Sequence, residues 1–223
     1  MIMIDVAAQI DAVTRELEDT THDGEEARVQ RLTQDLPATL PEAWGAVTDP
    51  ARITSWFQPV SGDLTVGGNY QIEGNAGGTV LACDPPRNGR AEFRVTWEFG
   101  GNVSWLEVRL RAVTPERTRV ELAHTAPIAS VPAEMWNTYG PGATGVGWDG
   151  GMLGLALNLG AQDAALSPAE AEAWAFTPEG QAFYRAAADS WAVAHVAFGE
   201  DPETAAQAAD ATYRFYTAQA PPA

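Results

Sequence analysis

RAEFRVTWEFGGNVSWLEVRLRAVTPERTRVELAHT, residues 90–125, contains three runs in which apolar and polar side chains alternate. Alternation with a period of two is typical of strands that cover an apolar core on one face and meet solvent on the other. The gaps between the runs, at residues 100–102 and 114–116, are too short for a parallel crossover, which needs about a dozen residues. The stretch therefore predicts three neighbouring antiparallel strands.

Similar runs precede this stretch, and the first long helical segment follows it. Further strands are predicted at residues 26–36, 63–66, 69–73 and 78–83, and two short helices at 41–47 and 51–57. Gly145 to Leu159 has the length and apolar content of a helix that covers one face of the sheet. The order predicts an α+β fold with a seven-stranded antiparallel sheet.

The two ends of the chain differ from this central part. Val6, Ile10, Val13 and Leu17 recur at helical spacing, which predicts a short and weakly supported helix in the N-terminal segment, residues 1–24. Proline follows a capping residue at Ser167, Thr177 and Asp201, so three Ala-rich helices are predicted within residues 168–219. We therefore divide the chain into the segment 1–24, a main domain at 25–166 and a helical extension at 167–223.

The charge and the single cysteine restrict the possible functions. The formal net charge is -17, all 13 basic residues are arginine, and such a chain should be repelled by nucleic acid and by anionic membranes. Cys83 excludes an intramolecular disulfide. The N-terminus lacks the pattern of a signal peptide, and no run reaches the roughly 18 apolar residues of a membrane span. We expect a soluble, cytoplasmic protein.

Several short strings resemble one known family. The order of elements is similar to the helix-grip fold of the START and birch-pollen-allergen superfamily (SRPBCC), and the strings resemble its heat-shock-protein-90 ATPase activator-like (AHSA-type) branch. The resemblance covers about residues 25–160. The strings are Ala43-Trp44, Val47-Thr48-Asp49-Pro50, Trp56-Phe57, Gly62-Asp63-Leu64, Gly67-Gly68, Asp84-Pro85-Pro86-Arg87, Thr96-Trp97-Glu98 and Gly145-Val146-Gly147-Trp148.

The resemblance implies a curved sheet that grips a long C-terminal helix, with an apolar cavity between them. Members of the superfamily bind hydrophobic small molecules, act as cyclases or related enzymes, or stimulate a chaperone. We expect binding of a small hydrophobic or aromatic molecule, with an enzyme of cyclase or hydrolase type as the alternative. A chaperone-accessory role ranks third, because eukaryotic activators carry an additional N-terminal domain and about 25 residues precede the first predicted strand here.

The glycines around residue 145 permit two interpretations. Residues 140–145 spell G-x-G-x-x-G, but residues 132–137 before them do not resemble the strand that a dinucleotide-binding unit requires, so no nucleotide or other cofactor is expected. Gly147, Gly151 and Gly154 instead fall on one line of the following helix. Glycine in a helix costs up to about 1 kcal/mol relative to alanine. The line therefore predicts either close packing against the backbone or vacant volume for a ligand.

The remaining site candidates are aromatic residues and one histidine. His124 should point inward by alternation, as a polar contact in the cavity, a satisfied core residue or, more weakly, a general base. The histidines and Cys83 form no pattern of metal ligands, so no metal is expected. In such a fold, aromatic residues at most of these positions belong to the core. The expected ligand-binding residues are Trp56, Phe57, Tyr70, Trp97, His124, Trp136, Tyr139, Gly147, Trp148, Gly151 and Gly154, with Trp136 and Tyr139 in a loop at the cavity entrance.

The extension has its own apolar stripe. Tyr184, Ala188, Trp191, His195 and Phe198 follow one another at helical spacing. The stripe predicts docking of the extension against the main domain, or alternatively a homodimer. The expected partner is thus a small hydrophobic molecule, with a second copy of the chain as a further possibility.

Overall fold

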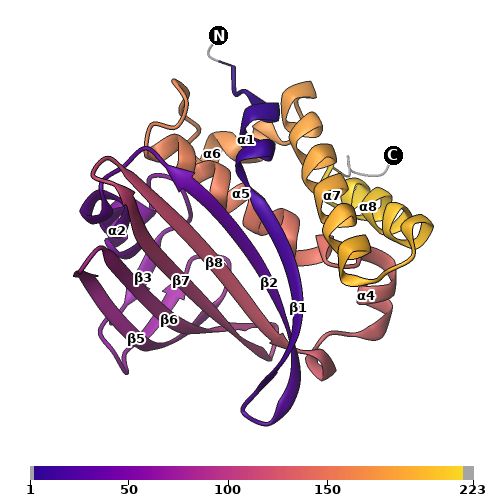
Figure 1. Cartoon of the computed structure of the whole chain (residues 1–223), viewed down its shortest axis with the longest axis horizontal. Helices are drawn as coiled ribbons and strands as arrows, with labels where there is room; N and C mark the ends of the chain where they lie inside the picture. Colours follow the sequence, from indigo (N-terminus) through magenta and orange to yellow (C-terminus); the bar gives the residue numbers. More distant parts are fainter. Residues whose placement is uncertain (1–2, 218–223) are drawn as a thin grey trace.

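Two-residue turns and short loops join the strands into one antiparallel sheet. Asp23 and Gly24, both with positive φ (51° and 86°), form the first hairpin turn. The computed structural model describes residues 3–217, and its eight strands follow the order β1-β2-β8-β7-β6-β5-β4-β3 (Figure 1). The strands are β1 (Thr14–His22), β2 (Glu25–Leu36), β3 (Val60–Gly62), β4 (Asn69–Ile72), β5 (Gly77–Arg87), β6 (Arg90–Phe99), β7 (Asn102–Thr114) and β8 (Arg117–Pro127).

The helices surround this sheet on its apolar side and at one end. They are α1 (Val6–Ala12), α2 (Leu40–Thr48), α3 (Pro50–Ile53), the 3-10 turn η1 (Ile128–Ser130), α4 (Ala133–Tyr139), α5 (Gly142–Asn158), α6 (Pro168–Trp174), α7 (Pro178–Phe198) and α8 (Pro202–Thr217). Figure 1 shows α7 and α8 beside the β1–β2 end of the sheet, opposite the end formed by α2 and β5. The α+β helix-grip architecture predicted from the sequence is confirmed.

The sheet has eight strands, so the prediction of seven is wrong by one. Helix α1 ends at Ala12, and β1, which the sequence analysis placed partly in a helix, pairs with β2 along its whole length. Its threonines are β-branched and disfavour a helix, while the Asp-Gly turn brings β1 against its partner. Residues 63–66 form a turn in which Asp63 Oδ1 accepts from the N–H of Thr65 at 3.0 Å, and the strand lies just before them.

Helix α5 lies across the inner face of the sheet. Its C-terminal half contributes Leu155 and Ala156 to a core with the inward side chains of β6, β7 and β8. Val146 and Met152 pack against α7 and β2. Leu153 and Leu157 join a third cluster with Ile4 and with Phe183 of α7. The helix therefore contributes side chains to all three apolar clusters of the protein's described residues.

The extension docks onto the main domain, as the apolar stripe predicted. Trp191 is 1% exposed and lies against α5, and Ala188 and His195 are buried beside it. Ser167 and Thr177 cap the N-termini of α6 and α7 as expected, and Gly199 in the left-handed conformation ends α7. Residues 218–223 of the predicted extension lie outside the described residues. Homodimerisation and the division at residue 167 stay predictions.

Candidate ligand-binding site

A cavity of about 170 Å³ lies between the inner face of the sheet and α5. Side chains of β6, β7 and β8 form its floor, α5 forms one wall, and α2, α3 and the following loop form another. Almost all of the lining is apolar. The apolar residues that line it include Val47, Ile53, Leu106, Val108, Leu122 and Leu155.

An irregularity in β5 brings a cysteine into this lining. The register of β5 against β6 shifts between Val80 and Ala82, so that Val80 pairs with Val95 and Cys83 with Phe93. Strict alternation would turn Val80 and Cys83 to opposite faces, and the shift lets both line the cavity. Cys83 lines the cavity and is also exposed at the surface. Partial burial of the thiol and the neighbouring Asp84 raise its pKa, which disfavours the thiolate at neutral pH.

Aromatic side chains form the rest of the enclosure. Trp56 is held by a hydrogen bond from its Nε1 to the carbonyl oxygen of Ala46 at 3.0 Å, and Phe57 packs beside it at 5.6 Å between ring centroids. Trp97 and Trp148 meet edge to face at 4.9 Å. Trp56, Phe57, Trp97 and Trp148 are all half-buried and all line the cavity, as expected.

Trp148 carries a hydrogen-bond donor that the protein does not use. Its Nε1 is buried and has no partner within residues 3–217. An unpaired buried donor costs roughly 1–3 kcal/mol, and most native structures avoid it. A ligand or a water molecule that accepts from this N–H would remove that cost.

Tyr70 lines the cavity as expected but offers no free hydroxyl. Its O–H donates to the carbonyl oxygen of Thr96 at 2.7 Å, and burial raises its pKa well above the usual range. The hydroxyl is therefore neutral and occupied. Tyr70 contributes an apolar ring surface to the cavity.

His124 points inward as predicted, but it lies behind the lining. It is 8% exposed and packs edge to face on Trp148 at 5.4 Å. Its Nε2 lies 2.9 Å from Ser104 Oγ, and Ser104 donates its own hydroxyl hydrogen to the carbonyl oxygen of Trp97 at 3.0 Å. Because the Ser104 hydroxyl hydrogen is used in the bond to Trp97, the Ser104 oxygen must accept from His124. The tautomer that carries its proton on Nε2 therefore satisfies both bonds. Burial lowers the pKa of His124 to about 4, so the ring is neutral at physiological pH.

This arrangement gives little support to the enzyme alternative. A histidine that activates a serine accepts the serine proton, whereas the Ser104 hydroxyl is committed to a backbone carbonyl. Neither residue lines the cavity. The structure thus supports the interpretation of His124 as a satisfied core residue that supports Trp148.

The glycines of α5 separate into two kinds. A Cβ added at Gly151 would meet nothing within 4 Å, and Gly151 lines the cavity. A Cβ at Gly154 would lie 2.6 Å from the carbonyl oxygen of Trp56, and one at Gly147 would lie 3.0 Å from the Tyr216 hydroxyl. Both alternatives of the sequence analysis therefore occur on one helix, with vacant volume at Gly151 and close packing at Gly147 and Gly154.

The structure does not bring Trp136 and Tyr139 to the cavity. They lie in α4, where the sequence analysis expected a loop, and α4 packs against α8. The Trp136 ring meets His195 at 5.3 Å, and Tyr139 meets Phe215 at 5.6 Å. The prediction of an entrance fails because the helices of the extension cover the segment that carries both residues.

Other classes of site find no support in the described residues. Within residues 3–217, no three His, Cys, Asp or Glu side chains come together as a metal-binding group. The same part of the chain contains no helix that is long and apolar enough to cross a membrane.

The curved sheet, the long helix across it and the apolar cavity between them define a protein of the helix-grip class. The family model described as activator of Hsp90 ATPase homolog 1-like protein matches residues 37–150, about half of the chain. The chain belongs to this family. The predicted resemblance to the AHSA-type branch is confirmed.

The chain is similar to several solved structures. The solution structure of CalU16 from Micromonospora echinospora is 30% identical with a TM-score of 0.64, covering 85% of this chain and 97% of CalU16. Its crystal structure gives 29% identity and a TM-score of 0.61, covering 82% of this chain and 98% of that chain. The MLL2253 protein of Mesorhizobium loti shares the fold at 19% identity and a TM-score of 0.50. The match covers 61% of this chain and 100% of MLL2253. Among curated proteins no significant match is found.

Proposed function

We propose that the protein binds a small aromatic molecule that carries a hydrogen-bond acceptor, in the cavity between the sheet and α5. The observation that carries this proposal is the buried, unpartnered Nε1 of Trp148, a residue that lines an otherwise apolar cavity. Apolar burial supplies affinity in such sites, and one or two polar groups fix the orientation of the ligand.

The volume of the cavity limits the size of the ligand. Drug-sized ligands occupy pockets of roughly 300–1,000 Å³. The cavity here measures about 170 Å³. An engineered apolar cavity of about 150 Å³ holds benzene. The ligand, or the part of it that enters, is therefore about as large as one substituted ring.

Two aromatic probes that differ in one polar group test the role of the Trp148 N–H. Acetophenone has a carbonyl oxygen that can accept a hydrogen bond, and ethylbenzene has a methylene group in place of that carbonyl group. We expect tighter binding of acetophenone by calorimetry, and loss of this preference in Trp148→Phe with ethylbenzene binding retained. Equal affinities for the two probes in the unchanged protein would contradict a polar contact at Nε1.

Neighbouring glycines test the location of the site. Gly151→Leu places a side chain in the cavity and should abolish binding of both probes. Gly150→Leu is the matched control, because a Cβ at Gly150 also meets nothing within 4 Å and Gly150 does not line the cavity. If Gly151→Leu folds and binds acetophenone as well as the unchanged protein, the cavity is not the binding site.

The family favours a second candidate function, the stimulation of an Hsp90 ATPase. The match at residues 37–150 supports it, since that family is described by this activity. The rate of ATP hydrolysis by a purified Hsp90, measured with increasing amounts of this protein, tests it. A saturable increase would support the chaperone role, and an unchanged rate over a range in which the cavity binds its probe would argue against it.

A further inference from the structure

Four arginines stand directly opposite one another on the outer face of the sheet. Arg87 of β5 pairs with Arg90 of β6, Arg90 pairs with Arg111 of β7, and Arg111 pairs with Arg119 of β8. Neighbouring strands are about 4.8 Å apart, so the row extends over about 14 Å. We call these four residues the arginine row.

Such a row is unfavourable for the sheet by itself. Like charges directly opposite one another on antiparallel strands destabilise the pairing. Only Arg119 of the row has an ion pair within the described part of the chain, to Asp35 of β2 with Nε and Oδ1 2.6 Å apart. Arg87, Arg90 and Arg111 are exposed and form no ion pair within residues 3–217. Three guanidinium groups are therefore free to take an external partner.

The arginine row borders a hollow of about 480 Å³ on the surface. Arg109 also lines it, but its charge is balanced by Glu107 at 2.6 Å and Glu121 at 3.1 Å. Five of the 13 basic residues of the chain thus gather at one hollow, although the net charge of the protein is -17. The carboxylates that face the hollow are Asp84, Glu92 and Glu121.

We propose that the arginine row binds a small anion with two or more negative charges, such as a diphosphate group or a polycarboxylate. Guanidinium groups donate paired hydrogen bonds that match phosphate and carboxylate oxygens. The volume of the hollow limits the anion to a small molecule. An extended polyanion is disfavoured, because the acidic remainder of the protein repels it beyond the row.

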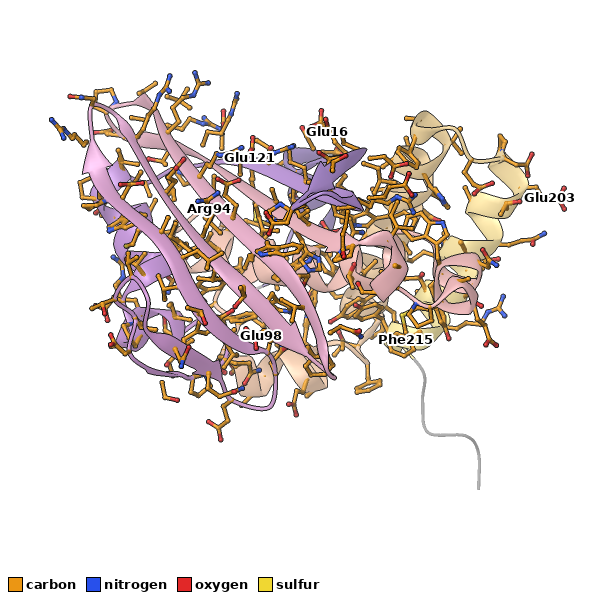
Figure 2. All side chains as sticks on the ribbon, turned by 90° about the horizontal axis from the view of Figure 1, so that it is seen from below. Glu16, Arg94, Glu98, Glu121, Glu203 and Phe215 are labelled. Carbon is orange, nitrogen blue, oxygen red and sulfur yellow. The ribbon has the colours of Figure 1, made fainter. Side chains whose placement is uncertain are left out.

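Calorimetry at low ionic strength tests this proposal, since salt screens exposed charges. Pyrophosphate and citrate are the probes, and sodium chloride of equal ionic strength is the reference. We expect saturable binding of at least one probe. Arg111→Gln should weaken binding at least tenfold, and Asp84→Asn should strengthen it. Arg94→Gln is the matched control, because Arg94 lies on the same face of the sheet (Figure 2) but pairs with Glu107 and does not line the hollow.

A second measurement does not depend on finding the ligand. Without any added anion, Arg111→Gln should raise the melting temperature relative to Arg94→Gln, because Arg111 stands between two other arginines whereas Arg94 stands opposite Glu107. Pyrophosphate should raise the melting temperature of the unchanged protein more than that of Arg111→Gln. Failure of both probes to bind, or equal weakening by Arg111→Gln and Arg94→Gln, would overturn the proposal. Gly151→Leu should leave this binding unchanged, so the result is independent of the cavity.

Discussion

Arg15 and Asp149 form a bidentate ion pair in the interior of the protein. Arg15 Nε and Nη2 donate to Asp149 Oδ1 at 3.1 and 2.7 Å, and the two side chains are only 5% and 1% exposed. Trp191 Nε1 donates to the other carboxylate oxygen at 2.8 Å. Burial raises the pKa of Asp149, and the contacts from Arg15 and Trp191 oppose that shift. The pair joins β1, α5 and α7, and it holds the residue that directly follows Trp148.

Removal of one partner of the Arg15–Asp149 pair should therefore strongly destabilise the protein. Arg15→Met leaves the Asp149 carboxylate buried without its cation, and we expect a loss of about 3–5 kcal/mol in the free energy of unfolding. Urea denaturation measures the loss. The double variant Arg15→Met/Asp149→Leu should regain much of it, because no buried charge is then left unpaired.

A partly exposed arginine provides the control for this prediction. Arg185 of α7 pairs with Asp189 and Asp210 at the surface. Arg185→Met should change the free energy of unfolding by less than about 1 kcal/mol. A similar effect of Arg15→Met and Arg185→Met would contradict the role of the buried pair.

Substitution by alanine should change the stability of the protein in opposite directions at Gly151 and Gly154 of α5. Gly151→Ala meets open space and should stabilise the protein by about 0.5–1 kcal/mol, since alanine is the better helix former. Gly154→Ala should destabilise it by about 1–3 kcal/mol, because the added Cβ would lie 2.6 Å from a backbone oxygen of Trp56. Thermal or urea unfolding of both variants measures the difference. Stabilisation by Gly154→Ala would contradict this prediction, because the backbone at Trp56 would then move away from the added Cβ at little cost.

The buried histidine makes stability depend on pH. The pKa of His124 is lowered from 6.5 to about 4, so the unfolded chain binds a proton more readily between these values. The stability gained by keeping His124 buried and neutral is fully present above pH 6.5 and is lost as the pH falls towards 4. Each pH unit within that window costs about 1.4 kcal/mol, or about 2 kcal/mol between pH 6.5 and 5. His124→Gln should remove this part of the dependence in urea denaturation series. Parallel pH profiles of the two proteins would refute it.

Cys83 offers a chemical probe of the cavity. The protein has a single cysteine, and its thiol lines the cavity. We expect slow alkylation of this exposed thiol by iodoacetamide at pH 7, because partial burial and Asp84 raise its pKa, and faster alkylation as the pH rises. Saturating acetophenone should slow the reaction, as followed by mass spectrometry. An unchanged rate would mean that the probe does not occupy the space beside Cys83.

Much of the fold was predictable because its signals are local. The alternation in residues 90–125 and the short turns between the runs correctly predicted β6, β7 and β8 as antiparallel neighbours. The cap-proline pairs correctly predicted α6, α7 and α8. Strand β1 was missed, although the Asp23-Gly24 turn is a typical hairpin signal and could have identified the preceding residues as a strand.

The site was predictable only in part. Trp56, Phe57, Tyr70, Trp97, Trp148 and Gly151 line the cavity as expected. His124 lies behind the lining, and Trp136 and Tyr139 lie under the extension, because strand parity and loop composition do not say which helix covers a residue. The turn of Cys83 into the cavity depends on a shift of register that leaves no clear mark in the sequence.

The sequence by itself determined the antiparallel order of most strands, the long helix across them and the family. These follow from periodicity, turn residues and caps, which act over a few neighbouring positions. Only the tertiary structure decided that Gly151 faces vacant volume while Gly154 touches a backbone, that Arg15 meets Asp149, and that four arginines stand in one row. Those outcomes depend on register and helix placement, which bring together residues far apart in the chain.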